Sequence, residues 1–404
     1  MTSAIGANIR RLREERGWSQ SRLARETCKA ARISGDPIGR QEISRYETGK
    51  RTPREWLPHI AAALGARTDD LTLEAQELIT PKPSLADFLP EDDALARVRS
   101  ARIRRIGLEE VQDITHRAHG LRLADDVVSG GDLIRPALRE LRSAIRMYRE
   151  GVYTEEIGNA FLAQVGELAQ ITGWIASDTG RQAEAERIYR LGISAARQAG
   201  DRTLTGNLAG SLAYQYSNTQ READGVALAA AAVQEAGSSA RPKAQALYLD
   251  RLAWAYAKVG DAQLAARALG DASEALTAHD AEDDAPDYLY WMNPDELKVM
   301  ESRCYTELRR PLRAVPLLRD VLSTYNATLT RELVLYLSWL VVALADANEP
   351  EEAALTAERA IQLSRCVASE RATVRIDVIL KRLAQYSDVP EVASLLANQR
   401  IPRR

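Results

Sequence analysis

Hydrophobic residues in the first seventy positions of the chain recur at helical spacing, in four short segments that polar turns separate. Ile5, Ile9 and Leu12 share one face of the first segment, and Gly17 ends it. Ser19 is suited to cap the second segment. The apolar positions of the later segments are Leu23, Ala24, Ile43, Tyr46, Trp56, Leu57, Ile60, Ala61 and Leu64. The pattern predicts four short helices around one small core.

The third segment, residues 39–50, is polar except at Ile43 and Tyr46, which lie three residues apart on one helical face. Gly49 suits a left-handed cap, and Pro53 suits the first position of the helix that follows. A surface helix with so little apolar area predicts an external partner. Its side chains suit DNA, because an Arg fork matches guanine O6 and N7 and a Gln amide matches adenine N6 and N7.

Taken together, these segments resemble the repressor-type helix-turn-helix family, which is also called Cro/Xre-like. The resemblance rests on Arg13, residues 17–20, residues 23–24, residues 43–50 and Pro53. In that family the third helix enters the major groove and its first residues reach base edges. The resemblance implies that double-stranded DNA is bound by Gln20, Arg40, Gln41, Ser44, Arg45, Lys50, Arg51, Thr52 and Arg54. It also implies a structural ion pair between Arg13 and Glu47.

The expected DNA contacts are of two kinds. Arg40, Gln41 and Arg45 face the bases, with Ser44 beside them, and each good bidentate contact discriminates between bases by roughly 1–3 kcal/mol. Gln20 opens the second helix, where side chain and backbone N–H groups commonly hold a phosphate. The expected phosphate contacts on the other side are Lys50, Arg51, Thr52 and Arg54.

One departure from the family pattern lies between the second and third helices. Glu47 follows Gln20 by 27 positions, which is roughly nine more than the family usually has. The extra residues lie between Cys28 and Gly39, where we expect the second helix to continue and the chain to turn at residues 35–37. The sequence does not reveal the role of this insertion, which bears on the angle at which the third helix meets DNA.

Charge divides the chain of 404 residues into a basic and an acidic part. Residues 1–71 hold 14 Lys and Arg against 9 Asp and Glu, and the remainder holds 40 against 48, so the net charges are +5 and −8. This division fits a DNA reader with a separate regulatory part. We expect a helix-turn-helix DNA-binding domain at 1–71, a Pro-containing, acidic linker at 72–93, and a helical repeat domain at 94–404.

Several function classes find no support in the sequence. No apolar run reaches the ~18 residues of a membrane span, so we expect a cytoplasmic protein without membrane contact that joins the nucleoid when bound to DNA. Cys28, Cys304 and Cys366 have no paired spacing, which predicts neither a disulfide framework nor a metal site. No catalytic motif accompanies His116 and His119, so we expect no enzyme activity and no cofactor.

The acidic part is an internal repeat. Tight turns align at Gly180, Gln220, Gly260, Arg309 and Asn348, with spacings of 40, 40, 49 and 39 residues. A recurring period of this size predicts an α-solenoid. A resemblance to tetratricopeptide repeats is carried around the third turn by Leu252, Ala253, Trp254, Ala255, Tyr256, Ala265, Leu269 and Ala272. We therefore expect an all-α chain, in which a helix-turn-helix domain is joined to a tetratricopeptide-like solenoid.

The first helix of each repeat pair carries a candidate binding surface, since the resemblance implies that the inner faces of these helices line a concave groove. Trp174, Tyr214 and Trp254 recur 40 residues apart on that face. Such an aromatic ladder suits a peptide or a small amphipathic molecule. The expected effector-groove residues are Glu167, Gln170, Trp174, Asn207, Tyr214, Asn218, Asp250, Trp254, Lys258 and Arg303. The same rings can instead pack between neighbouring helices, and the sequence leaves both interpretations open.

The two parts together resemble actinobacterial regulators of this design and, more distantly, peptide-pheromone-sensing regulators of Gram-positive bacteria. The resemblance implies a homodimeric, sequence-specific transcriptional regulator whose repeat domain dimerises and senses a peptide, a small molecule or a protein. Two-fold pairing lengthens the DNA site that one domain reads. The alternative is a protein-interaction scaffold whose helix-turn-helix domain keeps the fold without reading DNA specifically. The operator, the effector and the sign of regulation lie beyond the sequence.

Overall fold

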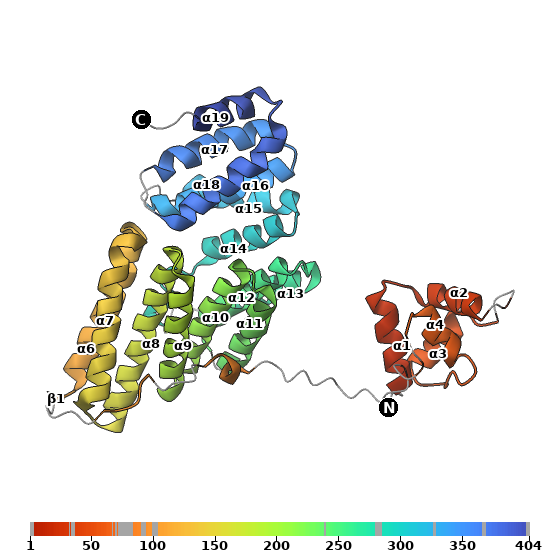
Figure 1. Ribbon diagram of the computed structural model, residues 1–404, viewed down its shortest axis with the longest axis horizontal. Coiled ribbons are helices and arrows are strands. Elements are labelled where there is room, and N and C mark those ends of the chain that lie inside the picture. Colours follow the sequence, from red (N-terminus) through yellow and green to blue (C-terminus); the bar gives the residue numbers. More distant parts are fainter. Residues whose placement is uncertain are drawn as a thin grey trace. The chain divides into compact units, whose positions relative to one another are not determined.

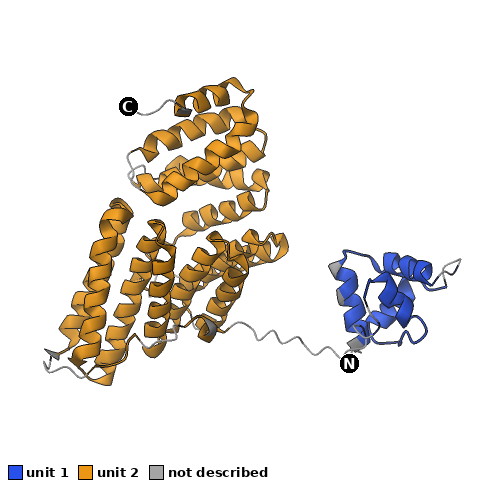
Figure 2. Ribbon diagram, viewed as in Figure 1, with its two compact units in different colours: residues 1–82 blue, residues 83–404 orange. Residues whose placement is uncertain are grey.

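The computed structural model describes residues 4–31, 33, 37–66, 68, 71, 84–89, 94–98, 104–237, 240–278, 285–325, 329–365 and 369–400. The chain divides into two compact units, Met1–Lys82 and Pro83–Arg404, which Figure 2 colours separately. We call them the head and the body. Residues 72–83 and 90–93 of the expected linker lie outside the described residues, so the linker stays a prediction.

The head consists of short helices around one core, as the hydrophobic pattern predicts. Its helices are α1 (Ala4–Glu15), α2 (Gln20–Ala30), α3 (Arg40–Glu47) and α4 (Leu57–Ala63). The core residues without exposed area include Ile9, Leu23, Ile43, Ile60 and Leu64. Because they come from every one of these helices or from its cap, burial of the apolar stripes holds the four helices together.

The ends of the head helices follow the expected caps with one exception. Ser19 Oγ accepts a hydrogen bond from the backbone N–H of Arg22, and Gly17 and Gly49 adopt φ angles of 62° and 71°. The exception is Pro53, which does not open the fourth helix. α4 begins at Leu57, after a turn at residues 54–56, and Pro58 takes the first turn of the helix. The expected start at Pro53 was therefore wrong.

The inserted segment extends α2 less than expected, because the helix ends at Ala30. Arg32 and residues 34–36 lie outside the described residues, so the expected turn at 35–37 stays a prediction. Cys28 and Ile38 are 4% and 3% exposed, and Cys28 Sγ lies 4.0 Å from the Ile38 carbonyl oxygen. The core thus fixes both ends of the segment, and α3 starts from an anchored position.

The body is a run of packed helix pairs (Figure 1). It opens with α6 (Leu108–Val127) and α7 (Gly130–Glu150). The pairs are α8 (Glu155–Asp178) with α9 (Gln182–Gln198), α10 (Arg202–Asn218) with α11 (Glu222–Ala236), α12 (Pro242–Lys258) with α13 (Ala262–Thr277), α14 (Pro294–Glu307) with α15 (Pro311–Thr324), and α16 (Thr330–Asp346) with α17 (Pro350–Ser364). α18 (Glu370–Leu383) and α19 (Pro390–Arg400) follow. The expected solenoid is confirmed.

Short elements complete the body. β1 (Arg104–Arg105) and β2 (Gly151–Val152) pair in parallel over two residues each, which is too short for a strand pattern in the sequence. Among the described residues, 3₁₀ turns occur at η1 (Leu85–Phe88), η3 (Asp287–Leu289) and η4 (Ala384–Tyr386). η1 lies within the expected linker range, yet Leu85 and Phe88 are 3% and 9% exposed in the main core of the body. These residues belong to the body.

Residues with a left-handed backbone conformation mark the turn within each helix pair of the repeat. The φ angle is positive at all five aligned turns, with 76° at Gly180, 62° at Gln220, 78° at Gly260, 55° at Arg309 and 63° at Asn348. A residue other than glycine loses roughly 1–2 kcal/mol in this conformation. The body tolerates that cost at three turns because each lets two helices of one pair fold back on each other. The turn register predicted from the repeat is confirmed.

Small residues let the helices of the body approach one another closely. At Gly173 of α8, a Cβ atom would lie 2.7 Å from Cε1 of Tyr189 on α9. At Gly206 of α10, a Cβ atom would lie 2.9 Å from Cε2 of Tyr248 on α12. Both tyrosines are 1% exposed. The glycines therefore make room for large buried rings, within one pair and between neighbouring pairs.

Candidate nucleic-acid interface and candidate effector site

α3 has a buried face and an exposed face. The residues of the buried face are Ile43, Tyr46 and Glu47. Arg40, Gln41 and Arg45, the expected base readers, are exposed, and Ser44 between them is half-buried. Because the buried residues fix the rotation of the helix, these four side chains share the outward surface of the head.

The expected phosphate contacts follow directly after α3. Lys50, Arg51, Thr52 and Arg54 are all exposed. The Arg51 backbone N–H donates to the Arg45 carbonyl oxygen at 3.2 Å, which holds this segment against the end of the helix. All of the expected DNA contacts except Gln20 therefore come from α3 and the residues that follow it.

A buried ion pair joins α1 to α3. Arg13 Nε donates to Glu47 Oε1 at 2.5 Å, and Arg13 Nη2 donates to Glu47 Oε2 at 3.0 Å. Arg13 Nη1 also donates to the Trp18 carbonyl oxygen at 2.8 Å. The hydrogen bond to Glu47 outweighs burial and raises the pKa of Arg13. The ion pair that the family resemblance implies is confirmed, and it fixes α3 within the head.

Gln20 makes a contact that the sequence pattern does not predict. Its Nε2 donates to Glu47 Oε2 at 2.8 Å, so the side chain joins the start of α2 to the ion pair between Arg13 and Glu47. The first backbone N–H groups of a helix have no partner within that helix. The phosphate-anchoring role of Gln20 stays a prediction.

A carboxylate lies among the expected DNA contacts. Glu42 Oε1 accepts a hydrogen bond from Arg45 Nη1 at 2.7 Å, and Glu42 Oε2 accepts one from Arg51 Nη1 at 2.9 Å. The Glu42 side chain is 21% exposed, against 54% for Arg45 and 62% for Arg51. The sequence pattern does not single out Glu42, although its spacing of three residues from Arg45 favours such a pair. Glu42 orders both guanidinium groups on the surface of the head.

A family model described as a helix-turn-helix domain matches residues 4–75, which include α1 to α4. The comparisons with curated proteins and with solved structures find no match. The chain therefore has a helix-turn-helix domain at its start, in agreement with the Cro/Xre-like resemblance, and an all-helical body after it. Such a domain indicates a DNA-binding regulator. The tetratricopeptide resemblance of the body stays a prediction.

The expected aromatic ladder forms on the first helices of the repeat pairs. The ring centroids of Trp174 and Tyr214 lie 6.0 Å apart, and those of Tyr214 and Trp254 lie 6.2 Å apart. Trp339 of α16 continues the ladder, edge to face, at 5.8 Å from Trp254. Trp254 and Trp339 are 3% and 9% exposed, whereas Trp174 and Tyr214 are half-buried. The ladder thus belongs to the core at one end and is partly accessible at the other.

Arginine side chains cover the rings of the ladder. The guanidinium carbon of Arg303 lies 4.9 Å from the Trp254 ring centroid, and Arg303 donates a hydrogen bond to the Tyr214 hydroxyl. Arg251 lies 4.4 Å from the Tyr214 centroid. A cation above an aromatic face gains roughly 0.5–2 kcal/mol. The sequence pattern missed Arg251, although it lies three residues before Trp254 on the same helical face.

Other expected effector residues have partners within the body. Hydrogen bonds join Glu167 to Arg122, Gln170 to Ser211, Asn218 to the Tyr214 carbonyl oxygen, and Lys258 to Glu307. Asn207 is buried, at 6% exposure. Except for that of Asn218, which stays within α10, these contacts join the inner helices to one another and to α6. The structure thus brings together Trp174, Tyr214, Trp254 and Arg303 rather than the whole expected set.

Asp250 differs from these residues because it is 2% exposed and its Oδ1 has no hydrogen-bond partner within the described residues. Burial outweighs the attraction of Arg251 and Arg303 and raises the pKa of Asp250 to about 6. Trp254 Nε1 and Arg303 Nε are also buried without a hydrogen-bond partner. Unpaired polar atoms thus gather at the middle of the ladder.

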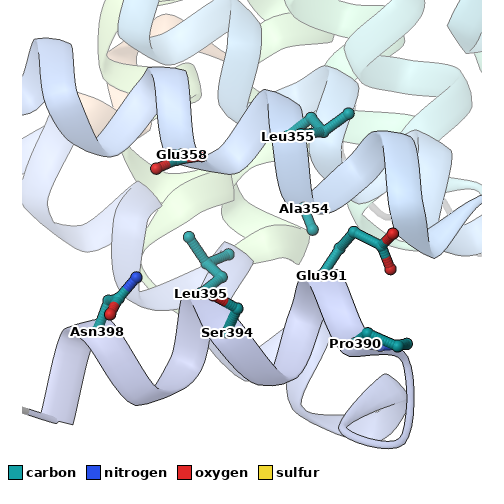
Figure 3. Close-up of a pocket in the computed structure, with 8 residues that line it drawn as sticks. All are labelled: Ala354, Leu355, Glu358, Pro390, Glu391, Ser394, Leu395 and Asn398. Atoms are coloured by element: carbon teal, nitrogen blue, oxygen red, sulfur yellow. The ribbon is translucent and has the colours of Figure 1, made fainter.

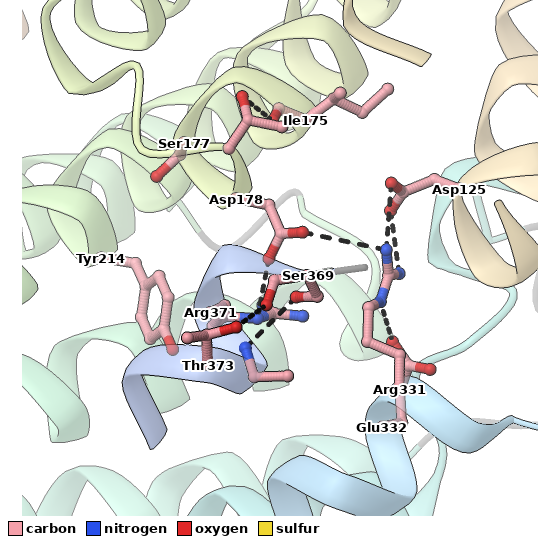
Figure 4. A network of polar contacts seen from close by, with 12 residues as sticks. Asp125, Ile175, Ser177, Asp178, Tyr214, Arg331, Glu332, Ser369, Arg371 and Thr373 are labelled. Atoms are coloured by element: carbon pink, nitrogen blue, oxygen red, sulfur yellow. Dashed lines mark hydrogen bonds and ion pairs between the residues drawn. The ribbon is translucent and has the colours of Figure 1, made fainter. Parts of the chain in front are cut away.

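Ion pairs join late helices of the body to early ones (Figure 4). Arg331 of α16 donates to the two carboxylate oxygens of Asp125 on α6, at 3.3 and 3.2 Å. Arg371 of α18 lies 3.0 Å from Asp178 of α8. Burial raises the pKa of Asp125 although Arg331 opposes the shift. Both arginines lie in the first turns of their helices, α16 and α18.

A pocket of about 350 Å³ lies apart from the ladder, between α17 and α19 (Figure 3). Leu355, Glu358, Glu391 and Leu395 are among its lining residues.

Over the ranges that the structure describes, no cluster of His, Cys, Asp and Glu is suited to a metal ion. In the same ranges, no helix has the length and hydropathy needed to cross a membrane. Two free cysteines, Cys28 and Cys304, are buried, and Cys366 lies outside the described residues.

Proposed function

We propose that the protein is a sequence-specific DNA-binding transcriptional regulator. The observation that carries the proposal is the exposed face of α3 in a helix-turn-helix domain, where Arg40, Gln41 and Arg45 lie together. Arg and Gln side chains match guanine and adenine edges in the major groove. The exposed basic residues after α3 supply phosphate contacts that position the helix. The protein acts by binding rather than by catalysis.

The proposed regulator is a homodimer whose body senses an effector. A single head reads only a short site, and two-fold pairing multiplies specificity. The partly accessible rings of Trp174 and Tyr214 support the binding of a peptide, a small molecule or a protein on the inner helices. An effector that binds one arrangement of the two heads better than another shifts the protein toward that arrangement and changes its affinity for paired half-sites.

A gel-shift titration with the region upstream of the protein's own gene tests the proposal. Replacing Arg40 and Gln41 together by Ala should weaken binding about 100-fold, because two bidentate base contacts are lost. The matched control replaces Arg197 and Gln198, an adjacent and exposed Arg-Gln pair on α9, and should bind like the unaltered protein. Light scattering should give twice the chain mass of 44.6 kDa.

Two results would contradict the proposal. Equal affinity for the upstream region and for shuffled DNA would favour the scaffold alternative, in which the head does not discriminate between sequences. Unchanged affinity after replacement of Arg40 and Gln41 would show that α3 does not read bases. A steep loss of affinity with salt is expected in either case, because it reports phosphate contacts alone.

A further inference from the structure

Three arginines in the interior of the body lack a carboxylate partner. Arg251 is 6% exposed, and Arg303 and Arg375 are half-buried. In the part of the chain that the structure describes, no carboxylate oxygen lies within 4.0 Å of their nitrogen atoms. Buried arginines that do have a carboxylate partner are Arg13, Arg122 and Arg331. Buried charges in proteins are usually paired, so the first group requires an explanation.

The three arginines come from α12, α14 and α18 and meet on two rings of the ladder. Arg251 and Arg303 lie 4.4 and 5.4 Å from the Tyr214 centroid. Arg303 and Arg375 lie 5.4 and 3.7 Å from the Trp339 centroid. We call Arg251, Arg303 and Arg375 the inner arginine cluster. Its members are separated by up to 124 positions in the chain, and the fold brings them together.

The charge around the inner arginine cluster is not balanced. Burial and the neighbouring Arg303 lower the pKa of Arg375 to about 10. Burial opposes ionisation of Tyr214, yet Arg303, Arg371 and Arg251 outweigh it and lower the pKa of that phenol. Asp250 attracts Arg251 and Arg303, and Glu307 attracts Arg375, but none of these attractions is an ion pair at contact distance. The surroundings of the cluster therefore favour negative charge.

Hydrogen-bond donors remain unused at the same place. Arg303 Nε and Trp254 Nε1 are buried and make no hydrogen bond with the described residues. Arg375 uses Nε for the Ser338 hydroxyl at 2.9 Å, which orients its guanidinium group over the Trp339 ring. A buried donor left without a partner costs free energy. The cluster thus combines excess positive charge with donors that an acceptor-rich molecule can satisfy.

We propose that the inner arginine cluster binds a compact oxyanion with more than one negative charge, of the phosphate or polycarboxylate class. Guanidinium groups form paired, charge-assisted hydrogen bonds with such oxygens, and Trp254 Nε1 adds a neutral donor. Because guanidinium groups already cover the ring faces, little ring surface remains for the side chains of a peptide. This inference rests on the proposed effector sensing and specifies its ligand class.

The test uses the full chain with sodium pyrophosphate and trisodium citrate as probes, and with sodium chloride at matched ionic strength. Three of the six tryptophans belong to the ladder, so intrinsic fluorescence should change on binding. A bound anion should raise the melting temperature by several degrees, since binding to the folded state alone stabilises it. Tighter binding of pyrophosphate indicates a phosphate ligand, and tighter binding of citrate indicates a polycarboxylate. No change beyond that with chloride overturns the proposal.

Variants of the inner arginine cluster distinguish anion binding from a purely structural role of its arginines. Arg303→Gln and Arg375→Gln should each weaken anion binding at least tenfold and abolish most of the anion-induced rise in melting temperature. The melting temperature without anion is measured for each variant as its own baseline, because each loses ring contacts and the hydrogen bond of Arg303 to Tyr214 or of Arg375 to Ser338. Arg267→Gln, at an exposed position of α13, is the matched control and should keep the full response. An undiminished anion response in both variants overturns the proposal. A lower melting temperature without anion, together with an undiminished response, assigns the arginines to packing.

A gel shift at matched ionic strength distinguishes this inference from the proposed function. If the anion changes DNA affinity in the unaltered protein but not in Arg375→Gln, the cluster is the effector site. If the anion binds and DNA affinity stays the same, the anion site stands and effector sensing through it fails. If the base-reading test on Arg40 and Gln41 fails while the anion still changes the fluorescence, only the DNA-reading proposal is contradicted.

Discussion

The head and the body bury arginine in opposite ways. Arg13 in the head is 8% exposed and makes a bidentate ion pair with Glu47. Arg251 in the body is 6% exposed and lies over the rings of Trp174 and Tyr214, and within the described residues no carboxylate, Asp250 included, forms an ion pair with it. Burial alone therefore does not define the role of an arginine. The paired Arg13 fixes α3 within the head, whereas the unpaired Arg251 belongs to the proposed anion site.

The strongest test of this comparison is Glu47→Gln in the head. It leaves Arg13 buried without its counterion, which typically costs about 3–5 kcal/mol of unfolding free energy. Hydrogen exchange measured on the full chain should show lost protection in α1 and α3 and unchanged protection in the body. Glu26→Gln, which breaks an exposed pair with Lys29, is the control and should change little. Unchanged protection after Glu47→Gln would show that the head does not depend on the pairing of Arg13, so the two units would not differ in how they hold a buried arginine.

Removing the negative charge of Asp250 in the body should raise the free energy of unfolding, whereas removing that of Glu47 in the head should lower it. Its pKa is raised to about 6 in the folded state, so the folded protein binds more protons than the unfolded one, and stability falls as pH rises from about 4 to 6. Asp250→Asn removes that loss. The variant should be more stable than the unaltered protein by up to about 3 kcal/mol at pH 7.5 and equally stable near pH 4.

Urea unfolding of both proteins between pH 4 and pH 8 measures this difference. Asp271→Asn, at an exposed position of α13, is the matched control and should show no pH-dependent difference. A variant that is less stable at pH 7.5 would show that Asp250 is a true counterion of the inner arginine cluster. The cluster would then resemble the Arg13 pair, and the comparison between the units would lose its basis.

The smallest expected effect concerns Glu42, which pairs with exposed arginines only. Glu42→Gln removes one negative charge from the expected DNA surface and frees Arg45 and Arg51. DNA affinity should rise about threefold to tenfold, and the salt dependence should steepen, because more positive charge faces the phosphates. Stability should change by less than about 1 kcal/mol. A fall in affinity of that size in the gel shift would show that Glu42 positions the arginines for DNA.

Much of the fold could be predicted from local patterns. The repeat period located Gly180, Gln220, Gly260, Arg309 and Asn348, and all five have positive φ, because a chain that reverses between paired helices needs that conformation at the turn. Local patterns failed where tertiary packing decides. Pro53 and Pro58 both suit the first turn of a helix by sequence. Packing of α4 in the core of the head places the helix start at Leu57, next to Pro58. η1 lies in a stretch with linker composition, but Phe88 packs 6.3 Å from the ring of Tyr216.

The two candidate sites were predictable to different degrees, because local patterns indicate contacts within one helix but not contacts between distant helices. All of the expected DNA contacts except Gln20 lie close together in the chain, so their placement follows from α3 and the residues after it. The inner arginine cluster joins α12, α14 and α18, and no spacing within one helix indicates that Arg375 reaches the ring of Trp339. Trp174, Tyr214 and Trp254 were found because they repeat with the turns. Their different burial depends on neighbours from other helices, such as Trp339 and Arg303 against Trp254, which the repeat period does not determine.

The ion pair between Arg331 and Asp125 joins residues 206 positions apart, and that between Arg371 and Asp178 adds a second link. In an open row of repeats each unit touches only its neighbours, and the terminal units fray first. Here α18 cannot separate from the row without also leaving α8. These two ion pairs tie α16 and α18 to α6 and α8, so we expect fraying of α18 to be coupled to the stability of α8.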